Sequence, residues 1–530
     1  MTVTFSNEHD HKFQKITDQC FTANPKLLTK ASLSVPLATR TIRPQRYFVA
    51  TKINQATLAT AAWQPVTGAI ALHRYERLIY DLGALYVGHF QVAIDVAGSP
   101  MDAPLLMRTR FAERLQELSV DASCVTSWLP MAWIQDDTRH VELLPATVNF
   151  ERRYSCRYIM LEPVGQSLKW QPVLADAEFR AASAVLSQVV QPFSNDPPEL
   201  HEIDRVCLET LRNTMQTVFE DGTKRDRRLW LLDFRMQAKV NYVTFKHMKL
   251  AKKCLYLFGA FSDKDGRLPA DILTRTKIPV ADDLYWFDYQ LQFIMAVAEY
   301  IDATRDRVAL NDLYPVVKRS FEFIKVQLTT GLTVGQRADV FVDWSTNCNK
   351  EAAVQGILVQ AMKAFLKLAL QWKDPDVNEI QAWIKDLKIA TIKGFYDSDK
   401  AVFISGPNQE VNLLAQIQLL LANVLPSNEQ QRALQQLLHD FDFNNTAVTP
   451  STEALLAEVL LQNGQTKVAT DIIRQYWGAM VANDADTFWE VFDQTDANYS
   501  PYGSTLLNSY CFGWSCYPAY LLRTYLSDTW

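Results

Sequence analysis

The 530-residue chain lacks a strong charge of either sign and has few glycines. Its 53 lysines and arginines against 59 aspartates and glutamates give a net charge of −6, so it has no basic field to attract phosphate backbones. We therefore expect no nucleic-acid partner. Only 17 glycines, beside 48% hydrophobic residues and 13 tryptophans, favour a globular, helix-rich protein over a disordered or fibrous one.

The chain also lacks the spacings of disulfide frameworks and metal sites. Its eight cysteines include no CxxC pair, which is typical of reduced thiols in a cytoplasmic protein. Its eight histidines include no HExxH motif, so a structural zinc site is disfavoured, while carboxylate-only calcium sites stay open. The cysteines are Cys20, Cys124, Cys156, Cys207, Cys254, Cys348, Cys511 and Cys516.

A secretory signal and a membrane-spanning run are both missing from the pattern. The start, MTVTFSNEHDHKFQKITDQC, has no basic segment followed by an apolar one, and no uninterrupted apolar stretch reaches spanning length. We therefore expect a cytoplasmic location and no membrane partner.

The length suggests two or three domains, and the residue pattern changes once along the chain. Residues 47–53, 90–96 and 157–164 are rich in β-branched and aromatic residues, which predicts strands of an antiparallel β-sandwich. Three prolines then interrupt the stretch VVQPFSNDPPELHEIDR, and a helix is expected to begin near Glu199. We therefore predict a β-domain over 1–195 and a helical domain over 196–530.

The second part has apolar residues at helical spacing and reads as roughly a dozen helices joined by short loops. Such helices form a superhelical solenoid or a closed double-layered α/α barrel, and no repeat favours the solenoid. We predict the barrel. The expected segments include Trp230–Phe258, Leu284–Ile301, Asp312–Leu328, Glu351–Trp372, Val377–Lys393 and Gln409–Leu425.

The stretch DGTKRDRRLWLLD, residues 221–233, combines acidic, basic and aromatic side chains. If residues from Asp226 onward form the first turns of a helix that continues to Phe258, then Asp226, Trp230 and Asp233 share one face, because their spacing is i, i+4, i+7. Carboxylates accept hydroxyl protons and an indole packs on a sugar ring, so this face suits a carbohydrate pocket. The alternative is a solvated helix start with locally paired charges.

A glycosidase needs a second carboxyl group across the scissile bond. Glu490 follows Phe488 and Trp489 in TFWEVFD and precedes a loop rich in Asn, Tyr, Ser and Gly. Aromatic neighbours desolvate a carboxylate and raise its basicity, which makes Glu490 a candidate general base. An ordinary surface glutamate is the alternative.

Four landmarks in order resemble bacterial α-L-rhamnosidases of glycoside hydrolase family 78. DGTKRDRRLWLLD resembles the family motif D-x-x-x-R-E-R-x-x-W-x-x-D, and TFWEVFD resembles the segment that bears the general base. DLGALYVGHF (81–90) is similar to a strand of the β-domain, and VDWS (342–345) to a G-D-W segment. The resemblance covers roughly Tyr80 to the C-terminus, in a compact form without a C-terminal β-domain.

The resemblance implies an (α/α)6 barrel and an inverting hydrolase that releases terminal α-L-rhamnose from small rhamnosides, with neither metal nor organic cofactor. Asp226 would be the general acid and Glu490 the general base. The residues expected to bind the sugar are Asp221, Arg225, Trp230, Asp233, Trp286, Asp288 and Trp344.

Two departures from the family pattern bear on activity. The family's usual acid is Glu, whereas this chain has the shorter Asp226. In the segment LNSYCFGWSCYP (507–518), related sequences carry a histidine near the Asn or before Gly-Trp, whereas this chain has Ser509 and Phe512. A related (α/α)6 glycosidase with another sugar specificity and a non-catalytic sugar-binding barrel therefore stay open as alternatives. For Trp128 and Trp133 of the β-domain we favour burial in the core; a homodimer contact and a second sugar surface stay open.

Overall fold

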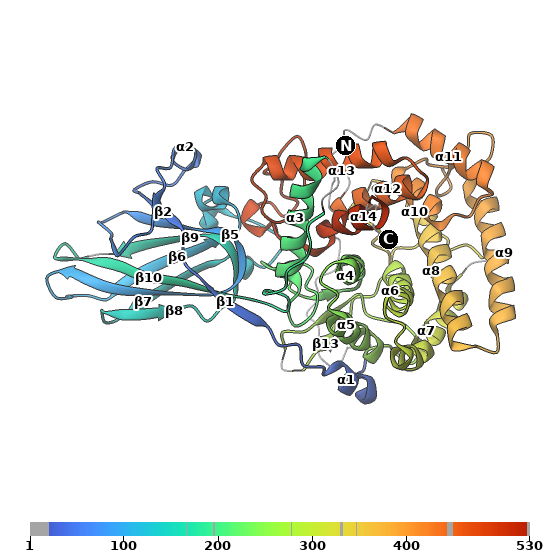
Figure 1. The fold of residues 1–530 in the computed structure, drawn as a ribbon, viewed down its shortest axis with the longest axis horizontal. Helices are drawn as coiled ribbons and strands as arrows, with labels where there is room; N and C mark the ends of the chain where they lie inside the picture. Colours follow the sequence, from blue (N-terminus) through green and yellow to red (C-terminus); the bar gives the residue numbers. More distant parts are fainter. Residues whose placement is uncertain are drawn as a thin grey trace.

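The computed structural model describes residues 21–165, 167–193, 197–276, 278–328, 332–345, 347–441 and 449–526. A β-sheet part and a larger helical part lie side by side (Figure 1). The predicted boundary between residues 195 and 196 falls outside the described residues, as do Cys20 and the N-terminal stretch. The other seven cysteines are free thiols.

The first part is built on one antiparallel sheet whose strands run in the order β1-β10-β5-β9-β6-β7. Its central strand β5 is 22 residues long and pairs with β2, β8, β9 and β10, so the strands form a single hydrogen-bonded sheet. The predicted segments 90–96 and 157–164 lie within β5 and β9, whereas only residues 47–50 of the segment 47–53 belong to a strand, β2. The strands are β1 (Ala38–Ile42), β2 (Arg46–Ala50), β3 (Gln64–Pro65), β4 (Ile70–Ala71), β5 (Arg77–Gly98), β6 (Leu105–Ala112), β7 (Asp136–Val141), β8 (Ala146–Asn149), β9 (Tyr154–Gly165) and β10 (Trp170–Ser183).

The helical part contains helices α3 to α14, in agreement with the expected dozen. They are α3 (Pro198–Thr214), α4 (Leu231–Val243), α5 (Met248–Ala260), α6 (Phe287–Thr304), α7 (Arg307–Gln327), α8 (Glu351–Trp372), α9 (Val377–Phe395), α10 (Leu413–Ala422), α11 (Ser427–Asp440), α12 (Pro450–Gln462), α13 (Thr466–Ala482) and α14 (Pro518–Tyr525). Two short helices, α1 (Pro25–Ala31) and α2 (Gln55–Ala59), precede them. Short strands β11 (Leu229–Trp230), β12 (Asp271–Leu273), β13 (Val280–Ala281), β14 (Tyr396–Asp397) and β15 (Val402–Phe403) lie between them.

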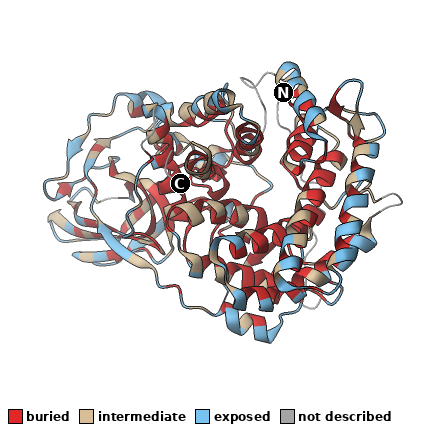
Figure 2. Cartoon of the chain, turned by 45° about the vertical axis from the view of Figure 1, so that its right-hand side comes forward, coloured by how far each residue is buried: buried red, intermediate tan, exposed pale blue. Residues whose placement is uncertain are grey.

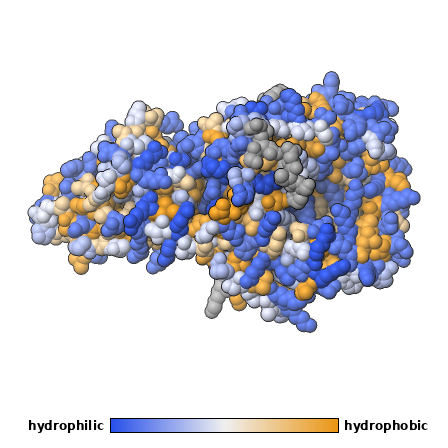
Figure 3. Space-filling model, viewed as in Figure 1, coloured by the Kyte–Doolittle hydropathy of each residue, from blue (hydrophilic) through white to orange (hydrophobic). Residues whose placement is uncertain are grey.

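The even-numbered helices from α4 to α14 contact one another in sequence order, and α14 returns to contact α4. Their facing sides are buried, whereas the outward sides of the surrounding helices are exposed (Figure 2). Helix α8 is long and apolar enough to cross a membrane by composition, yet it packs against α6, α7, α9 and α10. The apolar residues of α8 are therefore covered by neighbouring helices, and the outer surface of the protein is mixed in hydropathy (Figure 3).

The prediction of one helix running from Asp226 to Phe258 is wrong. Asp226 has a left-handed φ of 54° in the loop before α4, and Trp230 is the N-cap residue of α4. The helix then ends at Val243, and the side chain of Asn241 accepts the N–H of His247 at 2.9 Å in the turn that leads to α5. Because Asp226 precedes the helix, it does not share a helical face with Trp230 and Asp233.

A buried ionic contact ties the 221–233 segment to the β-domain. The Lys224 ammonium lies 2.7 Å from Glu117 and 3.3 Å from Glu113, and all three side chains are buried. Glu113 also accepts the hydroxyl of Ser155 at 2.6 Å and the main-chain N–H of Tyr510 at 2.6 Å. The carboxylate of Glu113 in the β-domain thus contacts two separate segments of the helical domain, one at Lys224 and one at Tyr510.

We expect Lys224→Met to destabilise the protein by about 3–5 kcal/mol, because it leaves two carboxylates buried together without their cation. Denaturant unfolding measures this change. Lys467→Met is the matched control, since Lys467 pairs with Asp471 on the surface and its side chain is 89% exposed. Equal unfolding midpoints for Lys224→Met and the wild type would contradict the role given to this contact.

Candidate active site

The loop that carries Asp221, Arg225 and Asp226 lies between α3 and α4 and is closed by hydrogen bonds between Asp221 and Arg228. Asp221 donates its N–H to the carbonyl of Arg228 at 3.1 Å, and its Oδ1 accepts the N–H of Arg228 at 2.9 Å. The carbonyl of Asp221 accepts the N–H of Gly513 at 2.6 Å. Asp226 therefore lies at the tip of a closed loop, where its positive φ is a conformation that aspartate tolerates better than most residues.

Glu490 lies in the loop after α13, with its carboxylate buried among hydrogen-bond donors. The carboxylate accepts hydrogen bonds from Arg225 and, at 2.5 Å, from the hydroxyl of Tyr502. Its main chain is held on both sides, because its N–H donates to Ser509 at 3.0 Å and its carbonyl accepts the indole N–H of Trp514 at 3.0 Å. The position of this carboxylate is thus fixed by the 502–514 segment.

Arg225 lies between the two candidate catalytic carboxylates. One terminal nitrogen of its guanidinium donates to Glu490, and the other lies 3.7 Å from Oδ2 of Asp226. Its Nε donates to the carbonyl of Leu507 at 2.7 Å, which fixes the plane of the group. The structure therefore brings Asp226 and Glu490, which are far apart in the sequence, to the same cation.

Burial is the main influence on the ionisation of the site. It raises the pKa of Glu490 above its usual range, and the hydrogen bonds and charge of Arg225 together with the Tyr502 hydroxyl offset part of that rise. Burial and the neighbouring carboxylates also hold the pKa of Asp221 and that of Asp233 well above their ordinary values. Burial thus favours the protonated form at Asp221 and at Asp233.

A group of aromatic rings lies at the N-terminal ends of α4 and α6. Trp230 stacks on Trp286 with ring centroids 5.4 Å apart, and Trp286 stacks on Phe341 at 5.0 Å. Trp344 meets Phe341 edge-on at 5.2 Å. The three predicted tryptophans therefore belong to one aromatic group, and Phe341, which the motifs do not mark, connects them.

Asp288 lies in the first turn of α6 and supports the neighbouring loop. Its two carboxyl oxygens accept the N–H groups of Phe341 and Val342 at 2.9 and 2.8 Å. Its direct contact with a ligand stays a prediction; the structure shows that it fixes the backbone that carries Trp344.

Two buried carboxyl oxygens at this end of the helices have no hydrogen-bond partner among the described residues. They are Oδ1 of Asp233 and Oδ2 of Asp271, and Asp271 pairs through its backbone with Trp230. Asp271 has no motif and was missed in the sequence, because only the pairing of β11 with β12 brings it here. Such acceptors suit a ligand that donates hydroxyl protons.

Tyr502 is a second residue that sequence reasoning missed, although the loop rich in Asn, Tyr, Ser and Gly that contains it was noted. Trp128 of the β-domain packs on its ring, with centroids 5.7 Å apart, and 42% of Trp128 is exposed. The preference for a buried core role at Trp128 is therefore wrong. Trp133 is half-buried and lies under the guanidinium of Arg227 at 5.9 Å.

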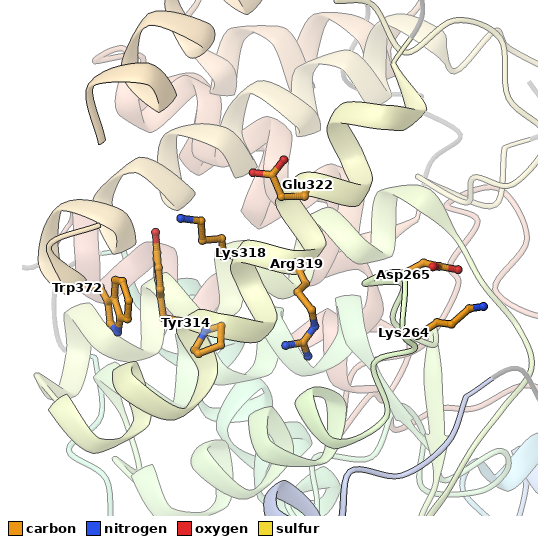
Figure 4. A pocket seen from close by; sticks show the side chains of 8 residues that line it. Lys264, Asp265, Tyr314, Lys318, Arg319, Glu322 and Trp372 are labelled. Carbon is orange, nitrogen blue, oxygen red and sulfur yellow. The ribbon is translucent and has the colours of Figure 1, made fainter. Parts of the chain in front are cut away.

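A separate hollow of about 400 Å³ lies on the outer helices and includes none of the predicted site residues. It is formed by the loop after α5, by α7 and by the end of α8, with Trp372 and Tyr314 at one side and Lys264 and Asp265 at the other (Figure 4). It is therefore distinct from the cluster around Glu490.

Comparison with known proteins shows that both parts of the chain match domains of one enzyme family. Residues 50–181 match the N-terminal domain of glycosyl hydrolase family 78 alpha-rhamnosidases, and residues 189–520 match the bacterial alpha-L-rhamnosidase 6 hairpin glycosidase domain. The structure of a rhamnosidase from Klebsiella oxytoca with rhamnose bound is 33% identical, with a TM-score of 0.89 over 96% of this chain and 100% of that one. No curated protein sequence matches the chain significantly.

Two more distant structures share the fold. The family 78 rhamnosidase of Bacillus sp. GL1 is 18% identical, with a TM-score of 0.74 over 87% of this chain and 48% of that one. The α-L-rhamnosidase of Streptomyces avermitilis, complexed with L-rhamnose, is 16% identical, with a TM-score of 0.67 over 92% of this chain and 44% of that one. This chain thus spans about half the length of either protein.

We expect Asp288→Asn to lower stability by about 1–3 kcal/mol, because an amide keeps one acceptor oxygen and turns its NH2 toward the second main-chain N–H. Thermal unfolding measures this loss. Asp302→Asn on the same helix is the control, since Asp302 makes an exposed ion pair with Arg305. A loss no greater than that of the control would show that the 341–342 backbone does not depend on Asp288.

Proposed function

Because the chain belongs to the bacterial α-L-rhamnosidases of glycoside hydrolase family 78, we propose that it hydrolyses terminal α-L-rhamnose from small rhamnosides such as disaccharides and aryl or flavonoid glycosides. The observation that carries the proposal is the meeting of Asp226 and Glu490 at Arg225, beside Trp230 and buried acceptor oxygens. A cytoplasmic location, proposed from the sequence, would restrict the substrates to imported small glycosides.

We propose an (α/α)6 barrel as the architecture of the helical part. The closed order of contacts among the even-numbered helices supports it, and so does a cavity of about 300 Å³ that takes lining residues from all six of them. The loops at the N-terminal ends of α4 and α6 then form one end of the barrel, where Trp230 and Trp286 lie.

The sugar would be held by acceptors and aromatic faces at this end of the barrel. Asp233 and Asp271 offer buried carboxyl oxygens to sugar hydroxyls, and the Trp230 indole offers a surface to the apolar ring face. Of the other residues predicted to bind the sugar, Asp221 and Arg225 already make hydrogen bonds within the protein, so only part of their hydrogen-bonding capacity is left for the sugar. Trp286, Asp288 and Trp344 would shape the wall beside the ring.

Hydrolysis would proceed by direct displacement. Asp226 donates its proton to the glycosidic oxygen as the bond to the anomeric carbon breaks, while Glu490 takes a proton from the water that attacks the opposite face. Glu490 must be ionised for this step, and the cation of Arg225 favours its ionised form. The configuration at the anomeric carbon is inverted.

We expect the purified protein to hydrolyse p-nitrophenyl α-L-rhamnoside in preference to other p-nitrophenyl sugars. Asp226→Asn and Glu490→Gln should each lower kcat by about 10²–10⁴-fold, since each removes a proton-transfer group. Asp302→Asn and Glu322→Gln are exposed controls with the same chemical changes. Turnover of another sugar would shift the specificity, whereas silence across the panel with rhamnose still bound would favour a non-catalytic barrel.

We also expect the first sugar released to be β-L-rhamnose, because a single displacement inverts an α-glycoside. Proton NMR of the anomeric signals, recorded before mutarotation equilibrates them, distinguishes the two products. Initial release of α-L-rhamnose would contradict the assignment of Glu490 as a base acting on water.

A further inference from the structure

Tyr502 is the second hydrogen-bond donor to the Glu490 carboxylate. It belongs to the loop after α13, whereas Arg225 belongs to the loop before α4. Its hydroxyl donates to Oε1 of Glu490 at 2.5 Å, while Arg225 donates to Oε2. The guanidinium of Arg225 also lies 4.2 Å from the centre of the Tyr502 ring. The two donors therefore contact each other as well as the carboxylate.

The ring of Tyr502 is held between the domains. It belongs to a small apolar cluster with Leu129 and Ile134 of the β-domain and with Leu506 and Leu507 of its own loop. Only 1% of Tyr502 is exposed, so its hydroxyl cannot turn to solvent and its direction is set by this packing.

The next residue, Gly503, lets the loop reach this position. It has a φ of 81°, and a Cβ added there would lie 2.7 Å from the carbonyl oxygen of Thr126 in the β-domain. A side chain at position 503 would therefore be strained and would push the loop away from the β-domain.

We propose that Tyr502 is a positioning residue that orients Glu490 for attack by water, and that the β-domain supplies the packing that aims it. The inference rests on the proposed function. With Arg225 and Tyr502 occupying one side of each carboxyl oxygen, Glu490 keeps acceptor capacity on its remaining lone pairs for the water.

The titration of Glu490 gives this role a specific readout. The charged and titratable groups that act on its carboxylate are Arg225 and Tyr502, which favour the ionised form, and Asp226 and Asp233, which oppose it. Replacing the hydroxyl of Tyr502 removes a hydrogen bond to the ionised form, so the pKa of Glu490 rises. The acidic limb of the activity profile then moves to higher pH.

The test is the pH profile of kcat/KM for Tyr502→Phe with p-nitrophenyl α-L-rhamnoside. We expect its acidic limb to move up by about one pH unit, and kcat to fall by about tenfold at neutral pH with KM little changed. Tyr499→Phe is the matched control, because it makes the same change three residues earlier in the loop. We expect it to keep the wild-type profile.

A second variant covers the case in which Tyr502→Phe fails to fold. Gly503→Ala keeps the hydroxyl but displaces the loop, and it should move the acidic limb in the same direction. An unchanged profile in a folded Tyr502→Phe or Gly503→Ala protein, beside an active wild type, overturns the positioning role alone. A wild type that is inactive on every p-nitrophenyl sugar overturns the proposed function and this inference with it.

Discussion

The arrangement of the site depends on the contacts that the Glu113 carboxylate makes. This carboxylate comes from the β-domain, yet it binds Lys224, two residues before Asp226, and the N–H of Tyr510, in the segment that pairs with the backbone of Glu490. Removing the β-domain would take away both carboxylate partners of the Lys224 ammonium. The β-domain is therefore a structural part of the site that the helical domain carries.

The second constraint is electrostatic. Several carboxyl groups lie close together in a buried region, where burial and the charges of neighbouring carboxylates raise the pKa of Asp221 and that of Asp233. Arg225 limits this repulsion at Glu490 and contacts Asp226 through its other nitrogen. This cation is placed asymmetrically, because it donates a hydrogen bond to Glu490, whose ionised form it favours, and lies 3.7 Å from Asp226.

The sequence was informative where residue periodicity or local chemistry decides the structure. The bounds of α8 agree with the predicted Glu351–Trp372, and α3 begins beside the expected Glu199, because buried faces and prolines determine both. The conformation at Asp226 could not be predicted, since its loop is also held by the N–H of Gly513, almost three hundred residues away in the chain, which donates to the carbonyl of Asp221. Asp271 was missed because only the pairing of β11 with β12 brings it to the site. Tyr502 lies 12 residues after Glu490, but no spacing within the loop indicates that its hydroxyl turns back to that carboxylate. The assignments of Asp226 and Glu490 stay predictions that the geometry supports.

The most direct test of the account is a crystal structure of the Glu490→Gln protein with p-nitrophenyl α-L-rhamnoside bound. The account predicts the rhamnose ring against Trp230, hydroxyls on Asp233 and Asp271, and the Asp226 carboxyl within hydrogen-bond reach of the glycosidic oxygen. The carboxyl of Asp226 and the side chain at position 490 should lie about 6.5–9.5 Å apart, with room for a water on the far face of the sugar. A sugar bound elsewhere, or an Asp226 carboxyl that does not reach the glycosidic oxygen, would contradict the account.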